Sequence, residues 1–329
     1  MKARALNLFI LILAAAFMLL SCAPEAKIPV AGNATGQDML TLLPADTSAF
    51  MVIDWNKAVN LPHLRAMLEE QPELQPYQKK LSSLADLNKD VYFLAVALAG
   101  ELKKPGENAV MLVNLKYQKE KFLPASTEKD STVEYYEGIP YFPMVEIEGS
   151  AVICVAFLDS SNMAVGTEKS VKKVIDVYKK KTPNLLTRKD MKSFLKDLNT
   201  GALTFSFFSI PPELINQAAA QNPQFKMWEN LRYLSAFSDY RNQLYSLEIK
   251  LYAQDKNQHE KMAETLAGLK ALGLGLAGQM PEITQVLNAL EITSTEKYVK
   301  VYLSLKQETV DQLRKALKEK AKTLSKEKL

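Results

Sequence analysis

The sequence has 329 residues, of which 47% are hydrophobic and 24% are charged, and its formal net charge is +4. These are ordinary values for a chain that buries a full core, and the length favours two domains or one large duplicated domain. So small a positive excess argues against a nucleic-acid partner, because a nucleic-acid-binding protein would carry a clear basic patch.

The amino-terminal residues have the order of a secretory signal peptide. Lys2 and Arg4 supply a positive start, and an apolar run from Leu8 to Leu20 follows. A membrane-spanning helix needs roughly 20 apolar residues, and this run ends sooner. We therefore expect residues 1–21 to be a signal peptide that is cleaved between Ser21 and Cys22.

The cleavage region Leu19-Leu20-Ser21-Cys22 resembles the lipobox of bacterial lipoproteins. The resemblance implies that a signal peptidase cuts just before Cys22 and that this cysteine carries a diacylglycerol. The acyl chains of a processed lipoprotein, palmitate among them, would hold the protein firmly on the membrane. Ala23 stands where an aspartate retains enterobacterial lipoproteins in the inner membrane. The expected location is the cell envelope, lipid-anchored and facing the periplasm, with the outer membrane favoured over the inner one.

Residues 22–40 are expected to form a flexible tether between the membrane and the folded part. They contain Pro24, Pro29, Gly32 and Gly36 and show no sustained hydrophobic period.

A first α+β unit is expected over residues 41–199. After a strand and a mostly helical segment, continuous apolar runs predict neighbouring antiparallel strands. Thr167 occupies the N-cap position of a helix over 168–180, whose apolar side chains fall on one stripe. A second short helix carries Met191 and Phe194. The predicted strands are 49–53, 91–98, 109–113, 133–136, 139–147 and 151–158.

A second unit is expected over residues 200–329, where the same order starts again. Alternating apolar residues predict strands around Phe205, Ile249 and Val301. Helices are expected through Trp228 and Leu234, through Met262 and Leu276, and at the carboxyl-terminal end.

The predicted fold class is α+β, with two related units that each form an antiparallel sheet with helices packed on one face. The distances from Phe50 to Tyr92 and from Phe205 to Leu247 are both 42 residues. Each distance links an opening strand to the next predicted strand, which suggests that one unit is used twice.

Several motifs match the letters of a functional site but lack its setting. Gly273–Gly278 matches the dinucleotide-binding pattern, yet it ends a predicted helix instead of joining a strand to a helix. We therefore expect close helix packing there and no cofactor. Ser-x-x-Lys, the nucleophile motif of penicillin-binding proteins, occurs four times without its companion motifs. The four copies are Ser126/Lys129, Ser170/Lys173, Ser193/Lys196 and Ser294/Lys297.

The histidines and cysteines offer little chemistry. His63 and His259 are the only histidines, and neither lies in a setting typical of a Ser-His-Asp triad. We expect both at a surface or an interface. Cys154 lies in an apolar run and is expected to be a buried core residue. Two histidines and one remaining cysteine cannot assemble an ordinary zinc site. We expect no catalytic residues and no metal.

Three further stretches together resemble an uncharacterised group of bacterial envelope lipoproteins built on a duplicated domain of unknown function. They are Leu43-Pro44-Ala45-Asp46, Met163-Ala164-Val165-Gly166-Thr167 and Leu290-Glu291-Ile292. The resemblance implies no catalytic residues that could be carried over to this chain.

The leading hypothesis is a non-catalytic, membrane-anchored envelope lipoprotein that acts as a binding or assembly module, with an envelope protein as its partner. One alternative is a carrier of lipid or of a small apolar ligand, because half-buried sheets covered by helices can enclose a pocket. The other is a hydrolase with an Asp/Glu or Ser-Lys site. The oligomeric state stays open.

Overall fold

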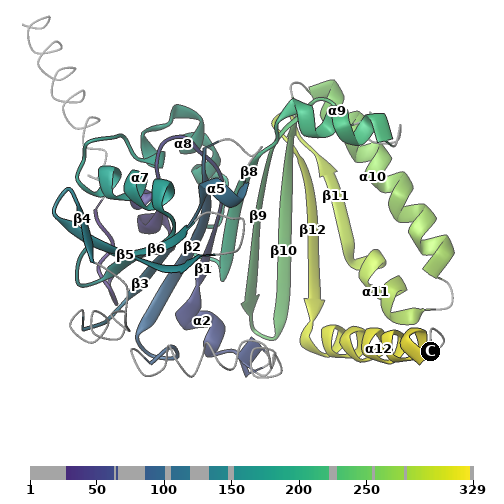
Figure 1. Ribbon diagram of the computed structural model, residues 1–329. Coiled ribbons are helices and arrows are strands. Elements are labelled where there is room, and N and C mark those ends of the chain that lie inside the picture. Colours follow the sequence, from purple (N-terminus) through teal and green to yellow (C-terminus); the bar gives the residue numbers. More distant parts are fainter. Residues whose placement is uncertain are drawn as a thin grey trace, which may run out of the picture.

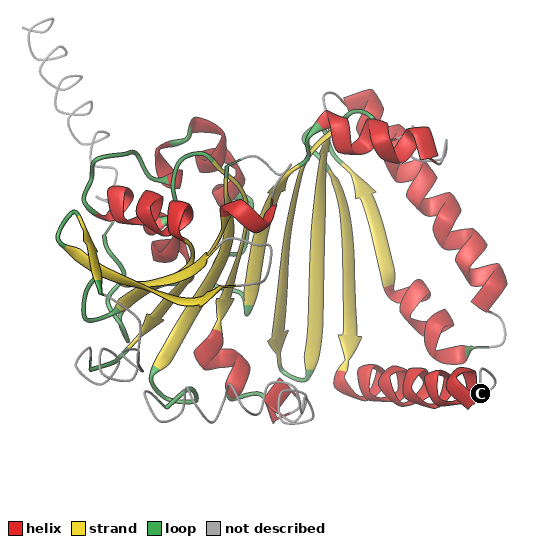
Figure 2. Cartoon of the chain, in the orientation of Figure 1, coloured by secondary structure: helices red, strands yellow, loops and turns green. Residues whose placement is uncertain are grey.

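The computed structural model describes residues 27–62, 64–65, 86–100, 105–118, 133–146, 152–221, 228–253, 256–277 and 280–326. Within these residues the strands form a 12-stranded sheet in which each neighbouring pair is antiparallel. Helices pack against this sheet, so the predicted α+β fold with antiparallel strands is confirmed (Figures 1 and 2).

The strands follow the order β11-β12-β10-β9-β8-β1-β2-β3-β7-β6-β5-β4 across the sheet. Their bounds are β1 Thr47–Asp54, β2 Val91–Ala99, β3 Ala109–Leu115, β4 Glu134–Tyr136, β5 Ile139–Glu146, β6 Val152–Phe157, β7 Asn162–Thr167, β8 Thr204–Ser209, β9 Leu231–Arg241, β10 Leu244–Ala253, β11 Leu290–Ser294 and β12 Val299–Lys306.

The described helices lie at both ends and on the faces of the sheet (Figure 1). Their bounds are η1 Gly36–Leu42, α2 Trp55–Val59, α5 Pro105–Asn108, α7 Glu168–Tyr178, η3 Leu185–Thr187, α8 Lys189–Lys196, α9 Pro212–Gln221, α10 Lys256–Leu276, α11 Pro281–Ala289 and α12 Gln307–Lys326.

The two halves of the sheet have matching connections. In the first half the spatial order is β1-β2-β3-β7-β6, and β7 leads into helix α7; in the second it is β8-β9-β10-β12-β11, and β12 leads into helix α12. The halves meet where β1 pairs with β8, for example at Phe50 opposite Phe207. The sheet therefore runs unbroken across the predicted boundary between residues 199 and 200.

The equal 42-residue spacing does not relate equivalent strands. Tyr92 lies in β2, whose counterpart by position is β9, whereas Leu247 lies in β10. The interpretation of that spacing was wrong because β9 was predicted as helix.

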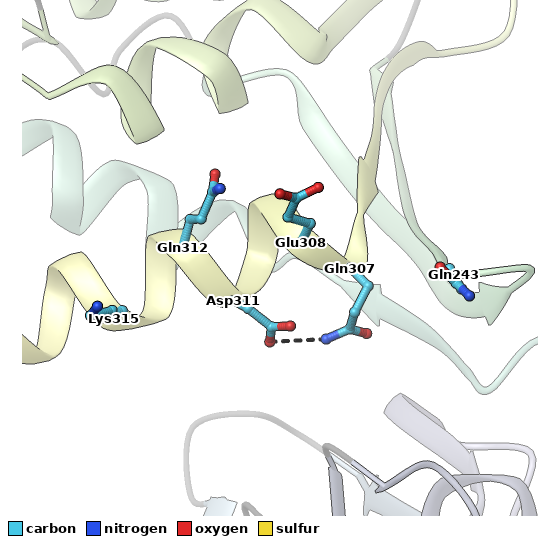
Figure 3. A pocket seen from close by; sticks show the side chains of 6 residues that line it. All are labelled: Gln243, Gln307, Glu308, Asp311, Gln312 and Lys315. Carbon is cyan, nitrogen blue, oxygen red and sulfur yellow. Dashed lines mark hydrogen bonds between the residues drawn. The ribbon is translucent and has the colours of Figure 1, made fainter.

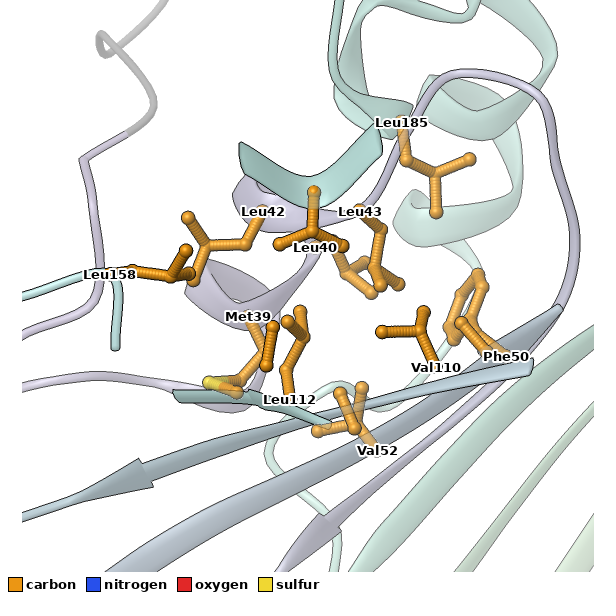
Figure 4. Close-up of a cluster of buried hydrophobic side chains, with 14 of the residues drawn as sticks. Met39, Leu40, Leu42, Leu43, Phe50, Val52, Val110, Leu112, Leu158 and Leu185 are labelled. Carbon is orange, nitrogen blue, oxygen red and sulfur yellow. The ribbon is translucent and has the colours of Figure 1, made fainter. Parts of the chain in front are cut away.

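The main core lies under η1, α7 and α8 and extends across the halves. Met39 and Leu40 of η1 and Ile175 of α7 are fully buried against Leu112 of β3, and Phe205 and Phe207 of β8 belong to the same cluster. Figure 4 shows this packing around Leu43, Phe50 and Val110.

Alternate residues of β6 lie on the two faces of the sheet. Cys154 and Ala156 belong to the main core, and Val155 and Phe157 belong to a second cluster with Phe142.

The second half of the sheet has a thinner core. Its buried cluster holds Ile215 of α9, Leu231, Leu251, Met262 of α10 and Val299. Helix α11 buries none of its residues. The helices of this half therefore cover the sheet less completely than those of the first half.

The predicted tether over 22–40 was wrong for the part that the structure describes. Thr35 caps η1, since its Oγ1 accepts from the Asp38 amide and the Asp38 carboxylate accepts from the Thr35 amide at 2.7 Å. Met39 and Leu40 are 0% exposed. This capping box starts a buried turn, so the fold begins well before residue 41.

The predicted helix through Trp228 and Leu234 was also wrong, because Leu231–Arg241 is strand β9. Tyr233 and Phe237 pack on the main core, whereas Leu234 packs on the cluster of the second half. With apolar side chains on both faces, the strand shows no clean alternation.

Candidate interaction surface

The predicted processing residues Ser21 and Cys22 lie outside the described residues, which begin at Lys27. Lipidation at Cys22 therefore remains a prediction. His63, Ser126 and Gly278 also lie outside the described residues.

The Ser170/Lys173 copy of the Ser-x-x-Lys motif does not form a nucleophile and base. Ser170 is 1% exposed, and its hydroxyl accepts from Thr167 Oγ1 at 2.9 Å. The Lys173 ammonium instead pairs with Asp46 at 2.5 Å and donates to the Ala99 carbonyl at 3.0 Å. Both side chains serve to fix α7 to its neighbours.

His259 is buried, and its predicted position at a surface or interface was wrong. It is 2% exposed, and its Nε2 accepts from the Ala253 amide at 3.0 Å. Within the part of the chain that the structure describes, its Nδ1 has no hydrogen-bond partner. This arrangement joins the first turn of α10 to the end of β10, which is a structural role.

Gly273 confirms close helix packing at one of the three glycines of the dinucleotide-like motif. A Cβ on Gly273 would lie 3.2 Å from Leu287 Cδ1 of α11, whereas a Cβ on Gly275 would meet nothing within 4 Å. Neither glycine opens a helix, so the geometry needed to cradle a pyrophosphate is not formed by these two residues.

Cys154 is buried in β6 as predicted, with 2% exposure. Burial raises the pKa of its thiol to about 11. Since the thiolate is the nucleophilic form, this residue is suited to packing and not to reaction.

A polar cluster lies where α7 meets the β4–β5 hairpin. The Tyr141 hydroxyl bonds the carboxylates of both Glu134 and Glu168, and the Lys172 ammonium pairs with Glu168 at 2.5 Å. Lys172 also lies 5.4 Å and 5.3 Å from the ring centroids of Tyr136 and Tyr141.

The charges of this cluster satisfy one another. The hydrogen bond from Lys172 lowers the pKa of Glu168, and the same bond raises the pKa of Lys172. The pKa of Tyr141 is raised to about 12, mainly by its hydrogen bond to Glu134 and to a smaller extent by burial. At neutral pH the tyrosine stays protonated and the lysine charged, so neither is poised as a general base. Among the described residues, no group of three or more His, Cys, Asp or Glu side chains is arranged to hold a metal ion.

A pocket of about 420 Å³ lies between the β9–β10 turn and the start of α12 (Figure 3). Its walls carry charges of both signs, from Glu308, Asp311 and Lys315, together with the amides of Gln243, Gln307 and Gln312. Gln307 Nε2 donates to Asp311 Oδ1 at 2.9 Å across one wall. All six lining residues therefore have polar or charged side chains.

Helix α10 exposes a row of leucines on its second half. Leu269, Leu272 and Leu276 are 53%, 67% and 86% exposed. Their spacing of three and then four residues places them on one side of the helix. We call these three side chains the leucine row.

The two halves of α10 differ in their polarity. In the first half Met262 is 4% exposed and faces the core, while Glu260 and Glu264 are exposed. From Ala267 to Leu276 the single charged residue is Lys270, whose ammonium donates to the Leu290 carbonyl of β11 at 2.6 Å. This second half is apolar on nearly every side, which is typical of a buried helix, yet three of its four leucines are exposed.

Among the described helices, α10 included, none combines the length and the apolar character required to cross a membrane.

No protein-family model matches this chain, and no curated protein matches it. Solved structures of the protein TP0453 are similar to it. Crystal form III of TP0453 matches with a TM-score of 0.50 and 12% identity, over 82% of this chain and 95% of TP0453. Crystal form IV gives 0.47 and 12% over 83% and 95%, and crystal form I gives 0.45 and 11% over 84% and 96%. At this identity the likeness to crystal form III shows the fold alone: this chain has the same overall architecture as TP0453.

Proposed function

We propose that this protein is a non-catalytic envelope lipoprotein, anchored through a lipid on Cys22, that binds a partner protein through the leucine row of α10. The observation that carries the proposal is the exposure of Leu269, Leu272 and Leu276 on a helix segment that has almost no polar side chains. Large apolar groups exposed together mark interaction sites more often than single ones do.

The geometry of the row fits one recognition mode. A helix that docks in a hydrophobic groove presents anchors at positions i, i+3 and i+7, which is the spacing of Leu269, Leu272 and Leu276. Helix α10 is held by Met262 in the core and by the bond between Lys270 and Leu290. A fixed helix binds with a smaller loss of conformational entropy than a free one. The proposed partner is therefore an envelope protein with an apolar groove.

The test is site-specific photocrosslinking in intact cells. A photoreactive side chain at Leu272 is expected to form one defined protein adduct, and that adduct should disappear when Leu269 and Leu276 are both changed to Gln. The matched control is Leu214 of α9, which is 45% exposed but lies on another helix. Adducts of equal yield from positions 272 and 214, or adducts unaffected by the two glutamines, would contradict a specific partner at the leucine row.

One observation favours a second function, a carrier of an apolar ligand. Leu244 and Leu247 of β10 are 43% and 38% exposed, in the half of the sheet with the thinner core. Native mass spectrometry of the full chain with Cys22→Ala would decide the matter. A co-purifying apolar ligand that Leu247→Gln releases supports the carrier, whereas a ligand-free mass counts against it.

A further inference from the structure

The segment Lys27–Thr35, which we call the strap, is held against the first half of the sheet. Asn162 Nδ2 of β7 donates to the Pro29 carbonyl at 2.7 Å. Thr41 Oγ1 donates to the Lys27 carbonyl at 3.3 Å. The backbone of the strap therefore has a defined position on the folded unit, from its first described residue onward.

Side chains of the strap alternate between the protein and its surroundings. Pro29 and Ala31 are buried, whereas Ile28 and Val30 are 37% and 55% exposed. Lys27, beside them, is also exposed. The strap thus presents two branched apolar side chains and one positive charge on its outer side.

A second lysine and a tyrosine adjoin the strap. A Cβ on Gly32 would lie 3.5 Å from the Tyr92 hydroxyl and 3.6 Å from the Lys116 ammonium. The Lys116 ammonium lies 5.5 Å from the centre of the Tyr92 ring. Apolar, aromatic and basic side chains in one patch are the combination that favours the interface between water and an anionic bilayer.

The length of chain between this patch and the predicted anchor is short. Lys27 follows Cys22 by five positions, and an extended chain spans at most about 3.6 Å per position, or about 18 Å in all. The headgroup layer of a bilayer is itself about 5–8 Å thick. If Cys22 is acylated, Lys27 therefore lies within roughly 10–13 Å of the outer boundary of the headgroups, whatever the path of the chain.

We propose that the strap is the membrane-facing surface of this protein. Ile28 and Val30 enter the headgroup region of the bilayer that carries the anchor, and Lys27 and Lys116 face anionic headgroups. The inference rests on the proposed lipid anchor, because the anchor brings the patch to the surface at high effective concentration. It implies an orientation in which α10, in the other half of the sheet, stays free for a partner (Figure 1).

The test is fluorescence quenching on vesicles. The full acylated protein carries an environment-sensitive fluorophore on Ile28→Cys, Val30→Cys or, as the control, Leu214→Cys. Acylated Cys22 and buried Cys154 leave the introduced thiol as the reactive one. On vesicles of phosphatidylethanolamine and phosphatidylglycerol, quenching by aqueous iodide should fall several-fold at positions 28 and 30 and stay unchanged at 214.

Flotation and intact mass, measured on the same samples, separate the two proposals. Protein that floats and carries acyl mass, but is quenched at positions 28 and 30 as in solution, overturns the strap proposal and leaves the anchor standing. Protein that neither floats nor carries acyl mass overturns both. Changing Lys27→Glu and Lys116→Glu should restore part of the quenching at position 30 on these vesicles while leaving urea unfolding of the full chain unchanged. Quenching at position 30 that stays as low as with both lysines present would show that Lys27 and Lys116 do not contribute to the membrane contact.

Discussion

Asn162, in the first position of β7, donates a hydrogen bond from Nδ2 to the carbonyl of Pro29, which is 133 residues earlier in the chain, at 2.7 Å. The same nitrogen lies 3.0 Å from each carboxylate oxygen of Asp159. Asn162 Oδ1 in turn accepts from Asn114 Nδ2 of β3 at 3.0 Å. One buried amide thus joins the amino-terminal strap to two strands of the sheet.

Replacing Asn162 by Ala should destabilise the fold by about 1–3 kcal/mol, because Asn114 and the Pro29 carbonyl would each lose a partner inside the protein. Urea unfolding of the full chain measures the loss. Asn257→Ala, at an exposed position of α10, should change stability by less than about 0.5 kcal/mol. An Asn162→Ala variant as stable as this control would show that the strap is not held by the amide.

Two glycines offer a matched pair of substitutions with opposite signs. A Cβ on Gly166 of β7 would lie 2.5 Å from the Ala109 carbonyl oxygen and 2.9 Å from Val110 Cα, both backbone atoms of β3. Gly166→Ala should therefore cost about 1–3 kcal/mol through strain. Gly275 of α10 has open space, so Gly275→Ala should stabilise by about 0.5–1 kcal/mol through helix propensity. Thermal unfolding of the two variants measures both changes in stability. A Gly166→Ala variant with unchanged stability would contradict the β3–β7 pairing.

The polar cluster at Tyr141 predicts a change at alkaline pH. Because the folded pKa of Tyr141, about 12, lies above its ordinary value of 10.0, the protonated tyrosine stabilises the fold below about pH 10. This contribution is lost as the pH rises through about 12. Glu134→Gln removes the largest cause and should bring the pKa of Tyr141 down toward 10.0. Ultraviolet titration of tyrosinate, compared with a Tyr141→Phe variant, measures the shift. An unchanged titration curve in Glu134→Gln would show that the contact with Glu134 is not formed.

His259 gives a prediction for the start of α10. His259→Leu removes the acceptor of the Ala253 amide and should cost about 1–3 kcal/mol. The neighbouring Glu260→Gln is the control, since its pair with Lys256 is long, at 3.9 Å, and exposed, and such pairs contribute less than about 1 kcal/mol. Urea midpoints of the two variants provide the comparison. Equal midpoints would place His259 at the surface, as the sequence alone predicted.

Local signals in the sequence predict much of the first half of the sheet. Thr167 was expected to cap the helix that follows it, and its Oγ1 does accept from the Ser170 amide at 3.3 Å. The continuous apolar runs at Val91 and Ala109 pair as neighbouring antiparallel strands. Each of these elements is predicted by one signal within its own segment, either a helix cap or an apolar run bounded by turns.

Other elements depend on contacts that are distant in sequence. Strand β9 carries apolar residues on both faces because the main core lies on one side of it and the buried cluster of the second half of the sheet lies on the other. The prolines and glycines of the strap and η1 favoured the prediction of a flexible tether. The capping box at Thr35 and Asp38, which starts η1, was not part of that prediction. His259 was expected at a surface because its neighbours Glu260 and Lys261 are polar, but it lies three residues before Met262, on the same buried side of the helix.

The leucine row does not follow from the helical spacing that predicts a helix through Met262 and Leu276, because that spacing does not separate buried from exposed positions. In the structure Met262 is 4% exposed and Leu276 is 86% exposed. Apolar spacing alone does not say where a sheet stops covering a helix. A signal was present in the sequence, since the segment Ala267–Leu276 has one charged residue and thus no polar face to turn toward water.

The central claim is that Cys22 becomes the acylated first residue of the mature protein. The most direct measurement is the intact mass and amino-terminal sequence of the protein purified from its native membrane. We expect loss of the first 21 residues and added mass from acyl chains on Cys22, with neither change in a Cys22→Ala variant. Protein with an unacylated Cys22 and its first 21 residues still attached would contradict it.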